Sequence, residues 1–376
     1  MTMPFRPRWY FFIALVSITF IGPLSIHLFI PAMPAVKEAF GVSTGIAQLT
    51  LSLGMLSMAC FTVAYGGLSD RFGRKRVLLS GLVLFTCGAA TCMVAANMPM
   101  LLAGRILQGA GCGVVLARAI ARDVYGQGRV AQVIAYLTVA YVLGPMIAPP
   151  IGGHLTVLFG WRALFVFASA VGLVVILAVA FAVQETRARN VAAPRGVFVG
   201  YKSLLRRPRF VGFMLEPGLM SGAFFAQATA ASFLAAEHLG ADAAKIGLWF
   251  FAFPVGFMAG SFISGRISAN RSIEFMTILG GVVGVANGAL LAGWLYFGGV
   301  SMAALYIPGI FVGLAQGLAM PYAQAGAMAV DTELAGSASG ARWCSRSSSG
   351  RPRCNSSPGC SRTVPGCRWR RFTLPQ

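Results

Sequence analysis

Apolar residues run along this chain in blocks of about 20, separated by short polar segments. A block of that length, wound as an α-helix, crosses the hydrocarbon core of a bilayer, which is about 30 Å thick. The pattern predicts about ten membrane-spanning helices, at roughly residues 10–31, 46–67, 77–96, 100–121, 132–157, 162–183, 210–235, 246–266, 274–296 and 302–328.

Composition favours a membrane protein over a soluble one. Hydrophobic residues make up 57% of the 376 positions and charged residues only 11%, whereas a soluble domain carries about 25% charged residues. The predicted fold class is therefore an all-α membrane protein, with the lipid bilayer as its surroundings. A net charge of +20 could suit nucleic acid, but the cations lie in short segments between apolar blocks. We expect no nucleic-acid partner.

The cations also indicate the orientation. With the N-terminus in the cytoplasm, the loops on that side hold 17 cations and the opposite loops hold three, namely Lys37, Arg162 and Lys245. Cytoplasmic loops of membrane proteins are enriched in Lys and Arg. We therefore predict a multi-pass protein of the inner membrane with both termini in the cytoplasm. The 17 are Arg6, Arg8, Arg71, Arg74, Lys75, Arg76, Arg122, Arg129, Arg187, Arg189, Arg195, Lys202, Arg206, Arg207, Arg209, Arg266 and Arg271.

A polar, basic segment at about 184–209 divides the chain. It separates a six-helix N-terminal half (1–183) from four further spans (210–340), and we expect it to be a cytoplasmic linker. A six-helix half followed by such a linker is typical of transporters built from two repeats. The second half is therefore predicted to be incomplete.

The composition changes abruptly at residue 341. Residues 341–376 hold eight Arg, seven Ser and four Cys but no Lys, Asp or Glu, and no apolar run that could span a membrane. We expect a disordered tail and interpret it as an out-of-frame product that replaces two spans. The alternative is a basic tail that binds anionic lipid; sequencing the genomic locus separates the two. The Cys spacing there does not match paired zinc ligands, so no metal site is expected.

The sharpest motif is Gly66-Gly67-Leu68-Ser69-Asp70-Arg71-Phe72-Gly73-Arg74-Lys75-Arg76, between the second and third spans. Glycines permit a tight turn, and a carboxylate near a helix N-terminus can pair with arginines. An ordinary positively charged loop is the alternative. The candidate gating residues are Gly66, Asp70, Arg71, Gly73, Arg74 and Lys75.

This segment resembles the signature loop of the major facilitator superfamily. Two more stretches resemble that family: Arg105-Ile106-Leu107-Gln108-Gly109-Ala110-Gly111, and an antiporter-type element in residues 144–153, where Ala148 replaces a Gly. Residues 118–123 and 30–34 resemble Bcr/CflA-type drug-resistance transporters, and the resemblance covers residues 1–340. The candidate residues of the antiporter-type helix are Gly144, Pro145, Pro149, Gly152 and Gly153.

The resemblance implies a function. Intact members have two six-helix halves around a central cavity and export small molecules in exchange for protons. We expect no cofactor beyond the proton gradient, no enzymatic activity, a small amphipathic substrate or drug, and a monomer. The alternatives are a same-fold exporter of sugars or amino acids, and a non-functional truncation product.

Ionisable residues inside spans are candidates for proton coupling or substrate binding, because each costs about 3 kcal/mol to insert. They are His27, Arg105, Arg118 and Glu216. By resemblance Arg105 belongs to the proton-coupling element, and His27 stands where the family usually carries an acidic residue. Histidine can titrate near neutral pH, although it could equally bond a neighbouring helix. Arg118 could instead reach toward the interface, and Glu216 could supply the missing negative charge.

Aromatic residues crowd the seventh and eighth spans, and two interpretations remain open for them. They could line a hydrophobic drug cavity, or they could pack against other helices and lipid. The residues are Phe224, Phe225, Trp249, Phe250, Phe251 and Phe253.

Overall fold

The computed structural model describes residues 9–112, 114–186, 206–267 and 271–348, with backbone alone at 114–115, 126–128, 131, 324 and 327–348. The chain forms two units, residues 1–330 and 331–376. Of the predicted tail, residues 349–376 lie outside the described residues, as do residues 187–205 of the predicted linker.

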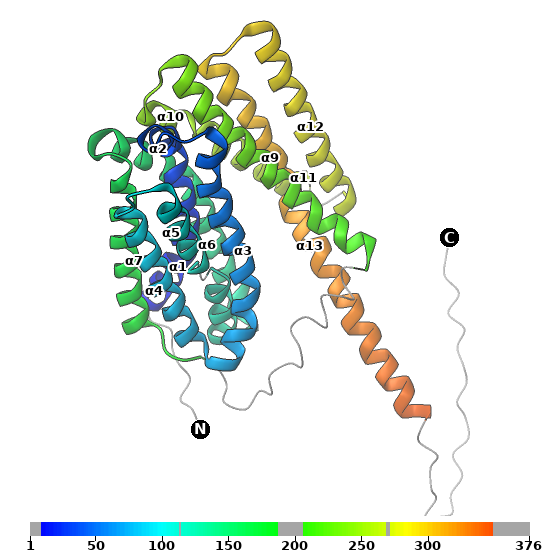
Figure 1. The fold of residues 1–376 in the computed structure, drawn as a ribbon. Coiled ribbons are helices and arrows are strands. Elements are labelled where there is room, and N and C mark those ends of the chain that lie inside the picture. The colour runs from blue at the N-terminus through cyan, green and yellow to red at the C-terminus, as the bar shows by residue number, and fades with distance from the viewer. Residues whose placement is uncertain (1–8, 113, 187–205, 268–270, 349–376) are drawn as a thin grey trace, which may run out of the picture. The chain divides into compact units, whose positions relative to one another are not determined.

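All the secondary-structure elements in the described residues are helices, as the all-α prediction requires (Figure 1). Up to residue 186 the elements are α1 (Trp9–Phe29), η1 (Ile30–Ala32), α2 (Met33–Phe40), α3 (Thr44–Phe72), α4 (Arg74–Met93), α5 (Met98–Ala110), α6 (Val114–Phe159) and α7 (Arg162–Ala182). From residue 206 they are α9 (Pro208–Leu239), α10 (Ala243–Trp249), α11 (Ala252–Ile267), α12 (Ile273–Gly298) and α13 (Met302–Ser348).

Nine helical stretches in the described part of the chain are long and apolar enough to cross a membrane. They correspond to all the predicted spans except the fourth, at 100–121. That span is interrupted: α5 ends at Ala110 and α6 begins at Val114. Glycine weakens a helix by about 1 kcal/mol relative to alanine, and Gly109, Gly111 and Gly113 cluster at the break.

The segment between the fourth and fifth predicted spans is a second difference. We predicted a loop at about 122–131, whereas α6 runs through it without interruption, from Val114 to Phe159. A polar sequence moves a chain out of the bilayer, but it does not break the backbone hydrogen bonds of a helix. Since no proline stands in residues 122–131, the helix continues.

Buried apolar side chains form two clusters. One holds residues of both halves, including Phe29, Trp161, Phe250 and Tyr306, near the ends where α2 and α10 lie. The other is made only of residues between Phe11 and Val183. The two halves therefore share an apolar core at one end of the helices, and the core at the other end belongs to the first half.

The aromatic residues of the seventh and eighth predicted spans differ in burial. Phe250 and Phe253 are 1% and 2% exposed and belong to the shared cluster together with Phe224. Phe251 is exposed. The three buried rings therefore pack in the shared cluster, and the drug-cavity interpretation stays a prediction.

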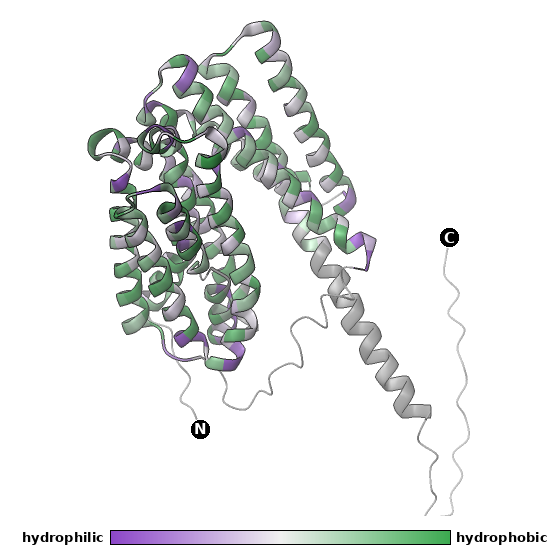
Figure 2. Cartoon of the chain, in the orientation of Figure 1, coloured by the Kyte–Doolittle hydropathy of each residue, from purple (hydrophilic) through white to green (hydrophobic). Residues whose placement is uncertain are grey.

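The outward surface is apolar along the helices. Phe181 is 85% exposed and Val285 is 76% exposed. Figure 2 shows hydrophobic residues along the helix lengths and hydrophilic ones gathered toward many of the helix ends. Such a surface is stable against lipid and unstable in water.

Candidate functional site

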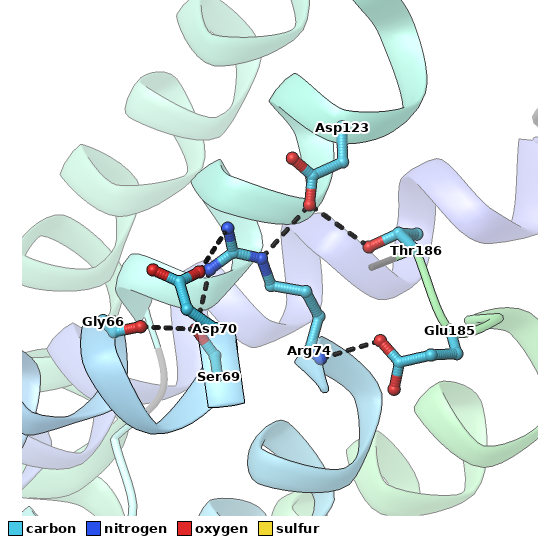
Figure 3. Close-up of polar contacts among 7 residues, drawn as sticks. All are labelled: Gly66, Ser69, Asp70, Arg74, Asp123, Glu185 and Thr186. Atoms are coloured by element: carbon cyan, nitrogen blue, oxygen red, sulfur yellow. Dashed lines mark hydrogen bonds and ion pairs between the residues drawn. The ribbon is translucent and has the colours of Figure 1, made fainter. Parts of the chain in front are cut away.

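The predicted gating loop folds around the side chain of Arg74. Helix α3 ends at Phe72, and Arg74 is the first residue of α4. Its Nη2 lies 3.0 Å from Asp70 Oδ1, its Nε donates to Asp123 Oδ2 at 3.1 Å, and its Nη1 donates to Ser69 Oγ at 2.7 Å (Figure 3). The planar guanidinium thus joins the end of α3 to α6, an arrangement that a single-point cation could not reproduce.

Two residues after α7 complete this group. Glu185 Oε1 accepts a hydrogen bond from the backbone N–H of Arg74 at 2.7 Å, and Thr186 Oγ1 donates to Asp123 Oδ2 at 3.4 Å. Because free N–H groups carry positive charge at a helix N-terminus, a carboxylate is stabilised there. We call Ser69, Asp70, Arg74, Asp123, Glu185 and Thr186 the Arg74 cluster. It ties together α3, α4, α6 and the segment that follows α7.

Glycine is required at position 73. Gly73 has φ of 101°, in the left-handed range that favours glycine, and a Cβ there would lie 2.5 Å from Glu185 Oε2. The other predicted loop residues have separate contacts. Lys75 Nζ donates to Ala180 O at 2.8 Å, the Arg71 guanidinium lies 5.2 Å from the Phe72 ring centroid, and Gly66 O accepts a hydrogen bond from Ser69 Oγ at 3.0 Å.

Arg105 is buried on α5, with 3% of its surface exposed. Its Nε donates to Thr50 O at 3.1 Å and its Nη1 donates to Gln108 Oε1 at 2.6 Å. The guanidinium carbon also lies 4.7 Å from the Phe29 ring centroid and 5.9 Å from that of Phe165. A backbone oxygen, an amide and two aromatic faces therefore stabilise the charge.

The rest of the R-x-x-Q-G pattern supports this arrangement. Gln108 supplies the acceptor for Arg105, and Gly109 lets α5 lie directly against α3, since a Cβ on Gly109 would collide with Gly54 O. The Nε2 of Gln108 is buried without a hydrogen-bond partner in the described part of the chain. This free donor lies beside the buried charge.

His27 faces the other half of the chain. It is 6% exposed, stacks on Phe225 at a centroid distance of 5.6 Å, and lies 5.8 Å from the Phe224 ring. Its Nδ1 is buried and has no hydrogen-bond partner among the described residues. The contact joins α1 to α9, and its neighbours are aromatic rather than acidic.

The antiporter-type helix has two packed faces. A Cβ on Gly144 would collide with Pro23, and one on Gly152 with Leu28 O, so these glycines face α1. A Cβ on Gly153 would collide with Ala243 O. Pro149 O would in turn collide with a Cβ on Gly247 of α10. One face of α6, with Gly144 and Gly152, thus packs against α1 of the same half. Another face, with Gly153, packs against the other half at Ala243. Pro145 lies inside the same helix.

An ion pair between halves was not predicted. Lys37 Nζ of α2 donates to Glu237 Oε1 at the end of α9. Lys37 follows α1 and precedes α3, so it lies at the end of the helices opposite the Arg74 cluster. No periodicity could have indicated a pair 200 residues apart.

The two remaining candidates lie elsewhere. Arg118 is partly buried on α6, and its Nε is buried without a partner in the described part of the chain. Glu216 lies on α9, and both of its carboxylate oxygens are buried and similarly unpartnered. The structure therefore brings Asp70 and Arg74 of the predicted loop into one cluster, with Gly73 beside Glu185. It does not gather His27, Arg105 and Glu216 at one point.

The family follows from a sequence comparison. The profile of the Major Facilitator Superfamily matches residues 15–350. The chain belongs to the Major Facilitator Superfamily. It is consequently a multi-pass membrane protein of a family of small-molecule transporters rather than an enzyme.

Several proteins of known sequence are similar to this chain over most of its length. The chain is 29% identical to Multidrug resistance protein D of Escherichia coli K12 over 331 residues, covering 86% of this chain and 82% of that protein. It is 26% identical to a Bicyclomycin resistance protein homolog of Haemophilus influenzae, covering 72% and 69%. A match at 29% identity to the uncharacterized transporter YdgK of Bacillus subtilis covers 65% of this chain and 63% of that protein.

Solved structures agree on the fold. A bacterial homolog of the human lysosomal transporter Spinster, inward-facing and unoccupied, is similar with a TM-score of 0.66 and 18% identity, covering 87% of this chain and 76% of that one. A D-xylose–proton symporter is similar with a TM-score of 0.60 and 15% identity, covering 86% and 87%. At these identities the likeness concerns the fold alone.

Proposed function

We propose that this chain is a proton-coupled secondary transporter of the inner membrane that exports small amphipathic molecules by alternating access. The names of the relatives support export of drugs. The N-terminus would face the cytoplasm, and the chain would act as a monomer. The Arg74 cluster would then lie on the cytoplasmic side, and the Lys37–Glu237 pair on the outer side.

The observation that carries this proposal is the asymmetry of the apolar core. At the outer end one buried cluster holds residues of both halves, including Phe29 and Phe250. At the cytoplasmic end the second cluster holds only residues between Phe11 and Val183. Two halves that are joined at one end and separately packed at the other can rock about the joined end, which is the motion that alternating access needs.

The seam between α6 and α10 supports the same motion. Pro149 and Gly153 on α6 meet Gly247 and Ala243 on α10 through backbone atoms. Contacts made by small residues can separate and reform without moving long side chains, and close packing is what holds membrane helices together. We propose that this seam closes the outer side while substrate loads from the cytoplasm.

Proton coupling would rest on the buried polar groups of the first half. His27 has a free Nδ1 where the halves meet, and Arg105 is a buried cation beside the free Nε2 of Gln108. A proton arriving at His27 would place a second positive charge in an apolar, aromatic setting. Since a buried unpaired charge is unfavourable, protonation would favour a conformation that wets this region.

Purified protein in liposomes tests the proposal. When the vesicle lumen is more acidic than the outside, protons that leave through the protein should drive a fluorescent amphipathic dye into the vesicles. A protonophore should abolish this uptake. A panel that includes neutral sugars and amino acids separates drug export from the alternative substrates. Dye uptake that ignores the pH gradient contradicts proton coupling, and the absence of any flux contradicts transport by this chain.

A further inference from the structure

A groove runs between α9 and α12, and one charged residue of each helix stands at its mouth. Its volume is about 830 Å³. Arg209 lines it near the start of α9 and Glu274 near the start of α12, and the two side chains form an ion pair. Both helices therefore begin at the same end of the groove, which is the cytoplasmic end in the orientation that we propose.

Beyond this pair the walls are apolar and open toward the lipid. Ile278, Val282 and Val285 line the groove from α12 and are 66%, 60% and 76% exposed. From Glu274 to Ala286 the lining of α12 extends over about 18 Å of helix, at 1.5 Å per residue. The hydrocarbon of one leaflet is about 15 Å deep, half of the 30 Å core. The groove is thus about as long as a lipid acyl chain in one leaflet.

Arginines crowd the mouth of the groove. Arg206 and Arg209 are exposed, and Arg207 is the N-cap residue of α9. An arginine side chain cannot accept a hydrogen bond, so Arg207 adds positive charge to a helix end that already carries it. On the other side of the mouth, the exposed Arg271 directly precedes the N-cap of α12. Among the described residues at these two helix starts, four arginines stand against one carboxylate, Glu274.

The second carboxyl group of the groove lies deeper. Glu216 is about 10 Å farther along α9 than Arg209. Both of its carboxyl oxygens are buried, and neither has a hydrogen-bond partner in the described part of the chain. In apolar surroundings the neutral acid is favoured over the carboxylate. The groove therefore presents positive charge at its mouth and an uncharged, apolar interior.

We propose that this groove binds an anionic phospholipid of the phosphatidylglycerol type, with its phosphate at the arginines and one acyl chain along the apolar walls. Guanidinium groups bind phosphate through paired hydrogen bonds, and basic pockets between membrane helices on the cytoplasmic side suit anionic headgroups. A soluble phosphate would match the mouth alone, and a helix of another chain would match the walls alone. The inference concerns lipid recognition and holds whether or not the chain transports protons.

Native mass spectrometry of the full chain in detergent counts bound lipids and tests the site without any flux. We expect dioleoylphosphatidylglycerol to bind at least tenfold more tightly than dioleoylphosphatidylcholine, which has the same acyl chains but no net charge. Glycerol 3-phosphate should not displace the lipid, because it makes no contact with the walls. Equal binding of the two lipids, or displacement by glycerol 3-phosphate, would overturn the proposal.

Charge variants test the mouth. Arg271→Gln should weaken phosphatidylglycerol binding at least fivefold, whereas Arg76→Gln, which removes an exposed arginine near the start of α4, should leave it unchanged. Arg209→Gln together with Glu274→Gln keeps the net charge and should also weaken binding. Glu274→Gln alone should strengthen it, because a competing carboxylate is lost. Weaker binding in Glu274→Gln would mean that the ion pair only shapes the groove, and would contradict phosphate recognition there.

A steric pair of variants tests the walls. Gly281 and Gly288 both lie on α12, and a Cβ on either would meet no atom within 4 Å, but only Gly281 of the two lines the groove. Gly281→Leu should remove the preference for phosphatidylglycerol by filling the groove, and Gly288→Leu should bind as the wild type does. Equal lipid binding by the two variants would place the lipid elsewhere. A dimer that phosphatidylglycerol does not dissociate and Gly281→Leu does would show a helix of a second copy in the groove, and would also overturn the lipid site.

Discussion

Glu185 caps the start of α4: its Oε1 accepts the backbone N–H of Arg74 at 2.7 Å across 111 residues of sequence. The contact brings the end of the sixth span onto the turn between the second and third spans. Because Arg74 also binds Asp70 and Asp123 through its side chain, one residue ties together three acidic partners from different parts of the first half.

Substituting Gly73 should destabilise this turn. Gly73→Ala places a methyl group against Glu185 and forces a positive φ on a residue with a Cβ, a strain of about 1–3 kcal/mol. We expect a lower apparent melting temperature in detergent than for Gly66→Ala, because a Cβ on Gly66 meets nothing within 4 Å. Equal melting temperatures would show that the cap does not constrain the turn.

Arg74 and Asp123 should be energetically coupled. Their side chains are 19% and 31% exposed, so solvent screens the pair only in part, and a coupling energy of about 1 kcal/mol is expected. A double-mutant cycle with Arg74→Gln and Asp123→Asn, read by thermal unfolding, measures it. Strictly additive effects would mean that the ion pair contributes nothing to stability.

Arg105→Lys should abolish most transport although it conserves the charge. A lysine cannot donate at once to Thr50 O and Gln108 Oε1 while its cation lies over the Phe29 ring. Each charged hydrogen bond that is lost costs about 1.5–3 kcal/mol, so at least a tenfold lower initial rate is expected. Arg162→Lys is the control, because Arg162 Nη2 donates to a single oxygen, Ala95 O, at 3.0 Å.

Alanine substitutions at the neighbouring glycines Gly152 and Gly153 of α6 should give two different defects. Gly152→Ala pushes α6 away from Leu28 of the same half and should lower the melting temperature. Gly153→Ala pushes α6 away from Ala243 of the other half and should leave the first half folded but expose the seam. Labelling of a cysteine introduced at Ala244, with an impermeant maleimide added outside, reports the seam. Indistinguishable labelling of the two variants would rule out the assignment of faces.

The Lys37–Glu237 pair should contribute modestly and in a salt-dependent way. Both side chains are partly exposed, at 29% and 44%, so the pair is worth at most about 1 kcal/mol. Lys37→Glu should slow transport at low ionic strength, and the double charge reversal Lys37→Glu with Glu237→Lys should restore it. If the double reversal did not restore the rate, the effect of Lys37 would not arise from its ion pair with Glu237.

Hydrophobicity alone predicted most of the spans, because a bilayer demands one length and one polarity from every crossing helix. It did not predict the break between α5 and α6 or the helical state of residues 122–131, because both depend on local backbone packing. Gly111 lies so close to Phe85 that no Cβ fits, and such a contact between helices leaves no periodic signal.

The candidate site was predictable where it is written in consecutive residues. Asp70, Gly73 and Arg74 stand together in the chain, and the turn between α3 and α4 keeps them together. Glu185 and Glu237 were missed because they come from distant segments, and only the folded helices bring them to their partners. The six-plus-four division, the orientation and the origin of residues 341–376 stay predictions.

Every residue of the Arg74 cluster lies between Ser69 and Thr186. The first half thus contains the whole Arg74 cluster. A polypeptide that stops shortly after Thr186 would still include all six residues of this cluster. Co-expression of the chain as two separate polypeptides, divided between residues 187 and 205, is therefore a natural route to split-protein reporters. Their reassembly would depend on the contacts between the halves, including the seam between α6 and α10 and the Lys37–Glu237 pair.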